Sequence, residues 1–386
     1  MKLACQRDLF SLDEKVTYLN CAYMSPQLKA VTAAGHHALL QKEQPQRIST
    51  ADFFEPQQRV KDLFGQLIAA PPERIALIPA ASYGLSTVAH NLPLEAGQEI
   101  LVVKDQFPSN YYPWAAVAAE RNAHLRMIGV EPGPDKGRRL NEALLAAISG
   151  RTALVAISHV HWAEGILFDL LALRQRTREV GSWLVVDGTQ SIGALPFSVA
   201  NIQPDALVVA AYKWLMGPYS TGLAYYGPAL AEGRPLEENW INRMDSQNFQ
   251  QLVNYQPRYQ SGMGRFSVGE QSNFVLLPML EAALQQLTAW RVDRIQDYCR
   301  DLNAPYLPRL RELGIGLLPE AQRAHHLLAL QLPAHVPLPA LREQLGRRQV
   351  EVSIRGASVR VAPHLYNRAE DWERLLAAIR AVAGGK

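Results

Sequence analysis

Short apolar runs that alternate with helical patterns constrain the fold of this chain more than any other feature. Continuous apolar runs of this length, separated by helices, are typical of a mostly parallel sheet covered by helices. Ligands of such sheets bind beyond the carboxyl ends of the strands, so the residues that follow each strand are the candidates for function. Strands are predicted at 74–80, 99–105, 153–160, 183–188, 206–212 and 222–227, with helices at 113–123 and 171–181.

The pattern changes from about residue 275. The sequence predicts a long helix at 274–290, a strand at 325–333, a helix at 337–349, a hairpin over 350–363 that turns near Gly356, and a helix at 367–382. We therefore expect a large α/β domain over 15–255. A small α+β domain with the linking helix is expected over 256–386, with residues 1–14 packed on it.

Composition excludes several classes of protein. Hydrophobic residues make up 48% and charged residues 19% of the chain, which is ordinary for a globular protein, and a net charge of +3 favours neither nucleic acid nor an anionic membrane as partner. The three cysteines form neither a disulfide framework nor a metal-type CxxC pair. No apolar run has the length of a membrane span or the form of a signal peptide. We expect a cytoplasmic protein without a metal site.

Lys213 is the only lysine between Lys136 and Lys386, in a chain that otherwise uses arginine as its cation there. It follows the apolar strand that ends in Tyr212. Burial lowers the pKa of an amine and makes it a better nucleophile, and an amine, unlike a guanidinium, forms an imine with an aldehyde. The alternative is a strand-end lysine that extends to solvent.

Asp187 stands at the carboxyl end of the strand 183–188, within the sequence DGTQ. A buried carboxylate of this kind keeps the pyridine nitrogen of pyridoxal phosphate (PLP) protonated, as its chemistry requires. Gln190 can donate to the phenolic oxygen of that cofactor. Read as isolated residues, Asp187 is a turn cap and Gln190 a solvent-facing amide.

The residues after two further strands are candidates to bind the phosphate and to stack on the ring of such a cofactor. Ala81 and Ser82 open a helix after the strand 74–80, where small residues let backbone N–H groups approach a phosphate. Phe107 follows the strand 99–105 and can stack on a pyridine face. The alternatives are an ordinary serine cap and a core aromatic residue.

The order Ser82, Phe107, Asp187-x-x-Gln190, Lys213 resembles the class V aminotransferase family of fold-type I PLP enzymes, which includes cysteine desulfurases, isopenicillin epimerase-like proteins and kynureninase-like hydrolases. The resemblance covers nearly the whole chain. It extends over YLNCAYMSP (18–26), SHVHWAEG (158–165), VVDGTQSIGALP (185–196), YKWLMGPYSTGLAYY (212–226), RFSVGEQSNF (265–274) and SVRVAPHLYN (358–367).

This resemblance implies a role for each matching position. Lys213 is the Schiff-base lysine and proton shuttle, Asp187 pairs with the pyridine nitrogen, Gln190 contacts the phenolic oxygen and Phe107 stacks on the ring. Ala81, Ser82 and Tyr212 hold the phosphate, and Arg360 binds the substrate α-carboxylate. A homodimer with shared active sites is implied too, in which the segment Gly269, Glu270, Gln271 and Ser272 reaches the phosphate site of the neighbouring subunit.

The sequence departs from the family at several positions. No cysteine occurs in RRQVEVSIRGASVR (347–360), where desulfurases carry theirs, which disfavours persulfide chemistry. His161 and Trp162 stand where the family has a cofactor-binding asparagine, so either contacts cofactor or substrate. Tyr23 is a further candidate at the substrate. Arg355 is a candidate for a second anionic group of the substrate, with a hairpin-turn cation as the alternative.

The net reaction is left open by the residues. An aminotransferase acting on a small amino acid is our first expectation, a β-eliminating carbon–sulfur lyase the second, and a racemase or epimerase the third. A nucleotide-binding oxidoreductase is disfavoured because no GxGxxG turn follows an early strand. A non-catalytic binding protein on the same fold is disfavoured because Lys213, Asp187 and Arg360 are all present.

Overall fold

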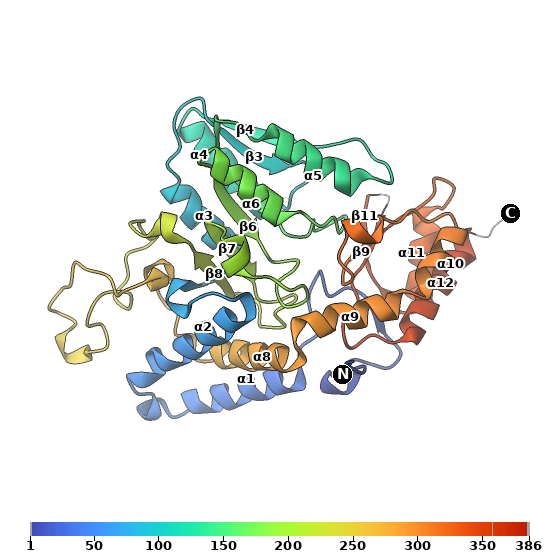
Figure 1. Cartoon of the computed structure of the whole chain (residues 1–386). Coiled ribbons are helices and arrows are strands. Elements are labelled where there is room, and N and C mark those ends of the chain that lie inside the picture. The colour runs from blue at the N-terminus through green and yellow to red at the C-terminus, as the bar shows by residue number, and fades with distance from the viewer. Residues whose placement is uncertain (1, 357, 384–386) are drawn as a thin grey trace.

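The computed structural model describes residues 2–356 and 358–383, and a seven-stranded sheet forms its centre (Figure 1). Strands β7, β6, β5, β3 and β4 run parallel, whereas β8 is antiparallel to both β7 and β2. The prediction of a mostly parallel sheet between helices is confirmed. In spatial order the strands are β2 (Ile75–Ile78), β8 (Gly222–Tyr226), β7 (Ala206–Ala210), β6 (Trp183–Asp187), β5 (Thr152–Ser158), β3 (Glu99–Val103) and β4 (His124–Ile128).

Helices bury both faces of this sheet, which explains why its inner strands are apolar throughout. In β6, Leu184 and Val186 face one core cluster and Val185 faces the other, as the two-residue period of a strand requires. One face is covered by α2 (Glu55–Ile68), α5 (Lys136–Ala147), α6 (Leu170–Glu179), α7 (Val199–Ile202) and α8 (Leu276–Trp290). The other is covered by α3 (Ala81–Asn91) and α4 (Tyr112–Glu120), while α1 (Lys29–Lys42) packs on α8.

The edge strand β4 was not predicted. His124, Arg126 and Met127 are exposed, and Leu125 and Ile128 are only half-buried. An edge strand has one unpaired side and tolerates charged side chains, so the apolar run that reveals the inner strands is missing here.

The C-terminal part has its own core and its own small sheet. Strands β11 (Ser353–Arg355) and β12 (Ser358–Val361) pair antiparallel, and the predicted hairpin turn is confirmed at Gly356, whose φ is +57°. β9 (Leu328–Gln331) pairs with β12. Around them lie α9 (Val292–Asn303), α10 (Tyr306–Glu312), α11 (Leu338–Arg347) and α12 (Ala369–Ala383), while β10 (Val350–Glu351) pairs with β1 (Thr17–Tyr18).

The linking helix α8 belongs to the core of the large domain. Its residues Leu277, Leu280 and Leu284 share one buried cluster with the central sheet, and that cluster continues into α9 at Ile295. The separate core of the C-terminal part includes Tyr306 and extends to α12. The domain boundary at 255/256 therefore stays a prediction.

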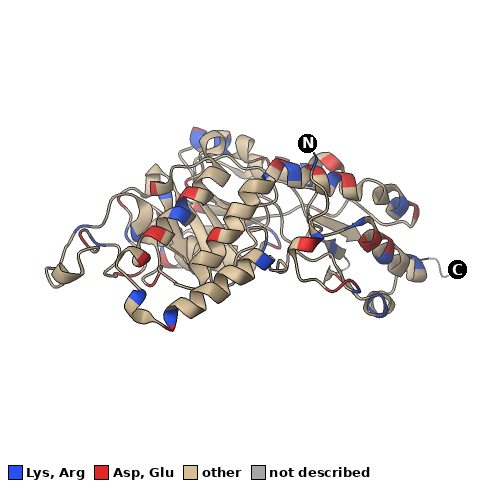
Figure 2. Cartoon of the chain, turned by 90° about the horizontal axis from the view of Figure 1, so that it is seen from below, with Lys and Arg blue, Asp and Glu red and all other residues tan. Residues whose placement is uncertain are grey.

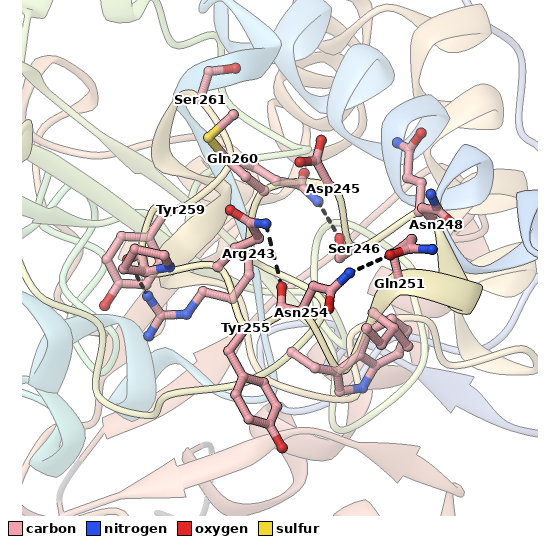
Figure 3. Close-up of a pocket in the computed structure, with 16 residues that line it drawn as sticks. Arg243, Asp245, Ser246, Asn248, Gln251, Asn254, Tyr255, Tyr259, Gln260 and Ser261 are labelled. Atoms are coloured by element: carbon pink, nitrogen blue, oxygen red, sulfur yellow. Dashed lines mark hydrogen bonds between the residues drawn. The ribbon is translucent and has the colours of Figure 1, made fainter.

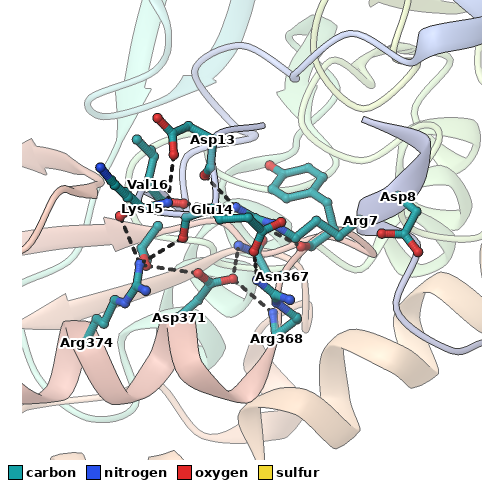
Figure 4. Close-up of polar contacts among 12 residues, drawn as sticks. Arg7, Asp8, Asp13, Glu14, Lys15, Val16, Asn367, Arg368, Asp371 and Arg374 are labelled. Atoms are coloured by element: carbon teal, nitrogen blue, oxygen red, sulfur yellow. Dashed lines mark hydrogen bonds and ion pairs between the residues drawn. The ribbon is translucent and has the colours of Figure 1, made fainter. Parts of the chain in front are cut away.

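Hydrogen bonds join the N-terminal segment to α12 and to the residues just before it (Figure 4). The buried guanidinium of Arg7 donates to the carbonyl oxygens of Asp13 (2.8 Å) and Tyr366 (3.4 Å), and Arg374 donates to that of Lys15 (2.9 Å). Thr17 Oγ1 donates to Asp371 Oδ1 at 2.9 Å. These contacts join the first residues to α12.

Acidic and basic residues are interspersed along the helices of both halves of the molecule (Figure 2). Within 2–356 and 358–383, no helix combines the length and apolar character needed to cross a bilayer.

Candidate active site

A cavity of about 280 Å³, here called the Lys213 cavity, opens at the carboxyl ends of β5, β6 and β7 and at the N-terminus of α3. This is the edge at which parallel sheets bind ligands. Many of the predicted site residues meet in its wall: Ala81, Ser82, Phe107, Trp162, Asp187, Gln190, Tyr212 and Lys213.

Lys213 is buried at the cavity wall, three residues beyond Ala210, the last residue of β7. Its Nζ lies 5.3 Å from the ring centroid of Phe107 and 5.3 Å from that of Tyr212. Within the described residues, Nζ has no hydrogen-bond or ion-pair partner. Burial lowers the pKa of Lys213 from 10.5 to about 8, opposed by the charge of Asp187 and supported by those of Arg360 and Arg355. The amine is therefore available as a nucleophile near neutral pH.

Asp187 ends β6 and faces the same cavity. Its Oδ1 accepts the backbone N–H of Thr189 at 2.9 Å, and Thr189 Oγ1 in turn accepts the N–H of Ala210 at 3.1 Å. Burial raises the pKa of Asp187, while the bonds from Thr189 and the charge of Lys213 act in the opposite direction. The carboxyl group thus needs a cationic partner to be stable as an anion in this position.

The side-chain amide of Gln190 is oriented by two protein partners. Its Nε2 donates to the carbonyl oxygen of Ala22 at 3.1 Å, and its Oε1 accepts from Trp214 Nε1 at 2.9 Å. An amide nitrogen carries two hydrogens, so one donor remains for a ligand in the cavity.

The N-terminus of α3 forms another part of the wall. Ala80 precedes the helix in extended conformation, and the helix lacks a side-chain cap, which leaves its first N–H groups free for an anion. Ser82 is exposed on this first turn. Across the cavity, the Tyr212 ring packs on Tyr219, with centroids 4.6 Å apart.

Phe107 and Trp162 form an aromatic corner of the cavity. Their ring centroids are 5.5 Å apart at an interplanar angle of 76°. Trp162 Nε1 donates to the carbonyl oxygen of Asp105 at 2.8 Å, which fixes the indole.

The two arginines predicted at the substrate do not border the Lys213 cavity itself, but both contact Trp162. Arg360 is buried; it donates to the Trp162 carbonyl oxygen at 2.8 Å and to Ser353 Oγ at 3.3 Å, while its Nε has no partner. Burial lowers the pKa of Arg360 to about 10, so it is still a cation at neutral pH. The guanidinium of Arg355 lies 5.6 Å from the Trp162 ring.

The structure corrects the placement of His161. It is buried outside the Lys213 cavity, where its Nδ1 accepts the N–H of Glu164 at 3.2 Å. The chain turns over 161–165, with the Gly165 N–H bonded to the His161 carbonyl oxygen at 2.9 Å, and this turn places Trp162 at the Lys213 cavity and His161 outside it. Tyr23 is also absent from the cavity wall, and its side chain is 57% exposed.

The segment predicted to reach a neighbouring subunit lies apart from the Lys213 cavity. Gln271 and Ser272 are buried by this chain, with Gln271 bonded to Asn242 and Ser272 to the Phe53 carbonyl oxygen. The N–H of Gly269 donates to the Glu237 carboxylate, and Glu270 is exposed.

Sequence reasoning missed polar residues of the wall. Ser158 and Gln106 line the cavity, and Ser158 Oγ and Gln106 Nε2 are buried without a partner. Ser158 ends β5 and pairs in register with Asp187, so the strand-end rule that selected Asp187 also identifies Ser158. Buried polar groups normally have a hydrogen-bond partner, so these two are candidates to bind a ligand or an ordered water molecule.

Cys21 lies in the core near this site. Burial raises the pKa of its thiol to about 12, so the thiolate that persulfide chemistry needs does not form near neutral pH.

The chain is similar to known proteins in sequence and in fold. A family model described as Aminotransferase class-V matches residues 48–380. An uncharacterized aminotransferase of Bacillus subtilis, YcbU, is 26% identical over 327 residues, covering 82% of this chain and 81% of the relative. The isopenicillin N epimerase of Amycolatopsis lactamdurans is 27% identical over 407 residues, covering 98% of each. The apo structure of a cysteine desulfurase from Thermococcus onnurineus has a TM-score of 0.83 at 20% identity, covering 100% of this chain and 99% of that one.

Proposed function

The chain belongs to the class V aminotransferase family, and from that premise we propose that it is an aminotransferase acting at the α-carbon of an amino acid. Members of this family use PLP, which supplies an aldehyde for amines and an electron-withdrawing ring. The residues of the Lys213 cavity fit that cofactor: a buried amine without a partner, a buried carboxyl group, aromatic rings and an uncapped helix N-terminus.

In this proposal each side chain has a distinct task. Lys213 holds the cofactor and moves the proton of the substrate Cα. Asp187 keeps a proton on the ring nitrogen, Gln190 donates to the phenolic oxygen, and the first N–H groups of α3 hold the phosphate. Arg360 binds the α-carboxylate through its guanidinium fork.

The single observation that carries the proposal is the one unpartnered amine in the cavity. Transamination needs a proton carried between two carbon atoms, and a single base between them suffices. Racemisation needs a second group that delivers a proton to the opposite face of Cα, and the protonated phenol of Tyr212 is the candidate for that role in this cavity, which makes an epimerase the second candidate function. Cys21 is a neutral buried thiol, which disfavours persulfide formation.

Incubation of the PLP-loaded enzyme with single amino acids and a keto-acid acceptor tests the reaction. We expect a keto acid and a new amino acid in equal amounts, and no reaction from Lys213→Ala. Lys104→Ala, at an exposed lysine, is the matched control and stays active. Pyruvate with ammonia or sulfide would identify a lyase, and inversion of the α-carbon without keto acid would identify an epimerase.

We also propose a homodimer. Support comes from the loop 240–261, which extends from the body of the molecule (Figure 1). Hydrogen bonds within this loop surround a pocket (Figure 3). The loop exposes Val253 by 76% and Tyr255 by 90%. Apolar side chains exposed to this extent favour a protein partner. Light scattering should give twice the chain mass, and Val253→Ser with Tyr255→Ser should reduce it. A fully active monomer would contradict this.

A further inference from the structure

A second cavity lies next to the Lys213 cavity, and Trp162 borders both. It has a volume of about 810 Å³ and is here called the hairpin cavity. The loops that follow β3 and β5 form one side, and the β11–β12 hairpin with Arg355 forms another. A ligand held at Lys213 therefore has open space beyond the indole.

Trp162 lines both cavities, and its indole is held in place. Its Nε1 is bonded to the Asp105 carbonyl oxygen at 2.8 Å, and its own carbonyl oxygen accepts from Arg360 at 2.8 Å. The Phe107 ring contacts it from the side of the Lys213 cavity.

Arg355 is a half-buried cation without an acidic partner. Its guanidinium lies 5.6 Å from the Trp162 ring, and Nη1 donates to the Ile354 carbonyl oxygen at 3.1 Å. No carboxylate within the described residues is at ion-pair distance from it. Lys136, in the same cavity, is in contrast paired with Glu164 at 2.7 Å. Donors of a guanidinium fork thus remain available at Arg355.

The register of the hairpin directs Arg355 and Arg360 to the same side. Ser353 pairs with Arg360, and Arg355 pairs with Ser358, so both arginines project from one face of the two strands. The charges of both arginines also lower the pKa of the Lys213 amine. A substrate whose α-carboxylate meets Arg360 can therefore extend its side chain toward Arg355.

The other ionisable groups of the hairpin cavity leave Arg355 as its unpaired cation. Lys136 and Glu164 neutralise each other. Burial lowers the pKa of His161, which is thus neutral. Asp105 adds a carboxylate at an exposed edge.

We propose that the hairpin cavity receives the substrate side chain and that Arg355 binds a carboxylate at its distal end. The substrate class is then an amino acid with an acidic side chain. This inference rests on the proposed function, since it places the α-carboxylate at Arg360. The fork of Arg355 matches a carboxylate in a bidentate pair, and Trp162 holds the fork in place.

Titration of the PLP-loaded enzyme with matched amino acids tests the assignment through the change in visible absorption. The pairs are L-glutamate with L-glutamine and L-aspartate with L-asparagine. We expect a dissociation constant at least roughly tenfold lower for the acid in one pair or both, as a charge-assisted bond gives. Arg355→Gln should abolish the preference, and Arg355→Lys should keep part of it. Arg347→Gln, at an exposed arginine, should leave it unchanged.

Two results would overturn the inference while the proposed function stands: equal binding of acid and amide by the wild type, or a preference that survives Arg355→Gln. A PLP-loaded enzyme that responds to no amino acid at all would contradict the proposed function, and the inference with it. Circular dichroism of each variant shows whether the fold is intact.

Discussion

Trp214 Nε1 donates to Gln190 Oε1 at 2.9 Å, and this bond determines which end of the Gln190 amide can face the cofactor. With Oε1 held by the indole, Nε2 is directed to the Ala22 carbonyl oxygen and to the cavity. Trp214 is fully buried and follows Lys213 directly. The positioning of a cofactor contact therefore depends on the residue next to the lysine.

Trp214→Phe removes this donor and leaves Gln190 Oε1 buried without a partner. We expect a loss of about 1–3 kcal/mol in the free energy of unfolding, measured by urea denaturation of the apoprotein. We also expect a shifted pKa of the visible absorption band, which Gln190→Ala reproduces. Trp183→Phe, at a half-buried indole, should leave the band unchanged. An unshifted band in Trp214→Phe would show that Gln190 needs no such positioning.

Asp187→Asn is expected to lower the activity without lowering the stability of the apoprotein. Burial raises the pKa of Asp187, so the folded state binds its proton more tightly than the unfolded state does, and the ionised group costs stability above the ordinary carboxyl range. The apo variant should therefore melt at the same or a higher temperature at neutral pH, while activity falls on the order of 10²-fold. A melting temperature well below that of the wild type would contradict this assignment.

Uptake of PLP by the apoprotein should follow the protonation of Lys213. Because burial lowers the pKa of this amine to about 8, the rate of appearance of the visible band should rise with pH and level off above that value. Asp187 raises and Arg360 lowers this pKa, so Asp187→Asn should move the midpoint down and Arg360→Met should move it up. Midpoints that move the other way would show that these charges do not act on Lys213.

Gly193 is required by the backbone of Trp214. Its φ is +99°, and a Cβ atom there would lie 2.2 Å from the Trp214 carbonyl oxygen. Gly193→Ala should reduce the free energy of unfolding by at least about 2 kcal/mol, measured with urea. Gly150→Ala is the control, because nothing lies within 4 Å of its added Cβ. Equal stability of the two variants would contradict the close approach.

The sequence was sufficient to predict the inner strands and the residues at their ends. Strands buried on both faces are apolar throughout, so Asp187 and Lys213 stand out where the apolar run stops. The sequence could not predict which of Trp162 and His161 faces the Lys213 cavity, because that depends on how the chain turns after β5.

Contacts between segments that are far apart in the chain could not be predicted from the sequence either. Arg355 meets Trp162 only when the C-terminal hairpin packs against the large domain. The exposed strand β4 lacked a signal because an edge position does not require apolar residues.

The central claim is that Lys213 holds the cofactor, and reduction with borohydride followed by peptide mass analysis tests it most directly. Reduction traps an imine as a stable amine, so the label marks the lysine that carried it. We expect loss of the visible band and a pyridoxyl-phosphate mass on the peptide that contains Lys213, and no label in Lys213→Ala. A label on another lysine, or a protein that takes up no PLP, would contradict the account.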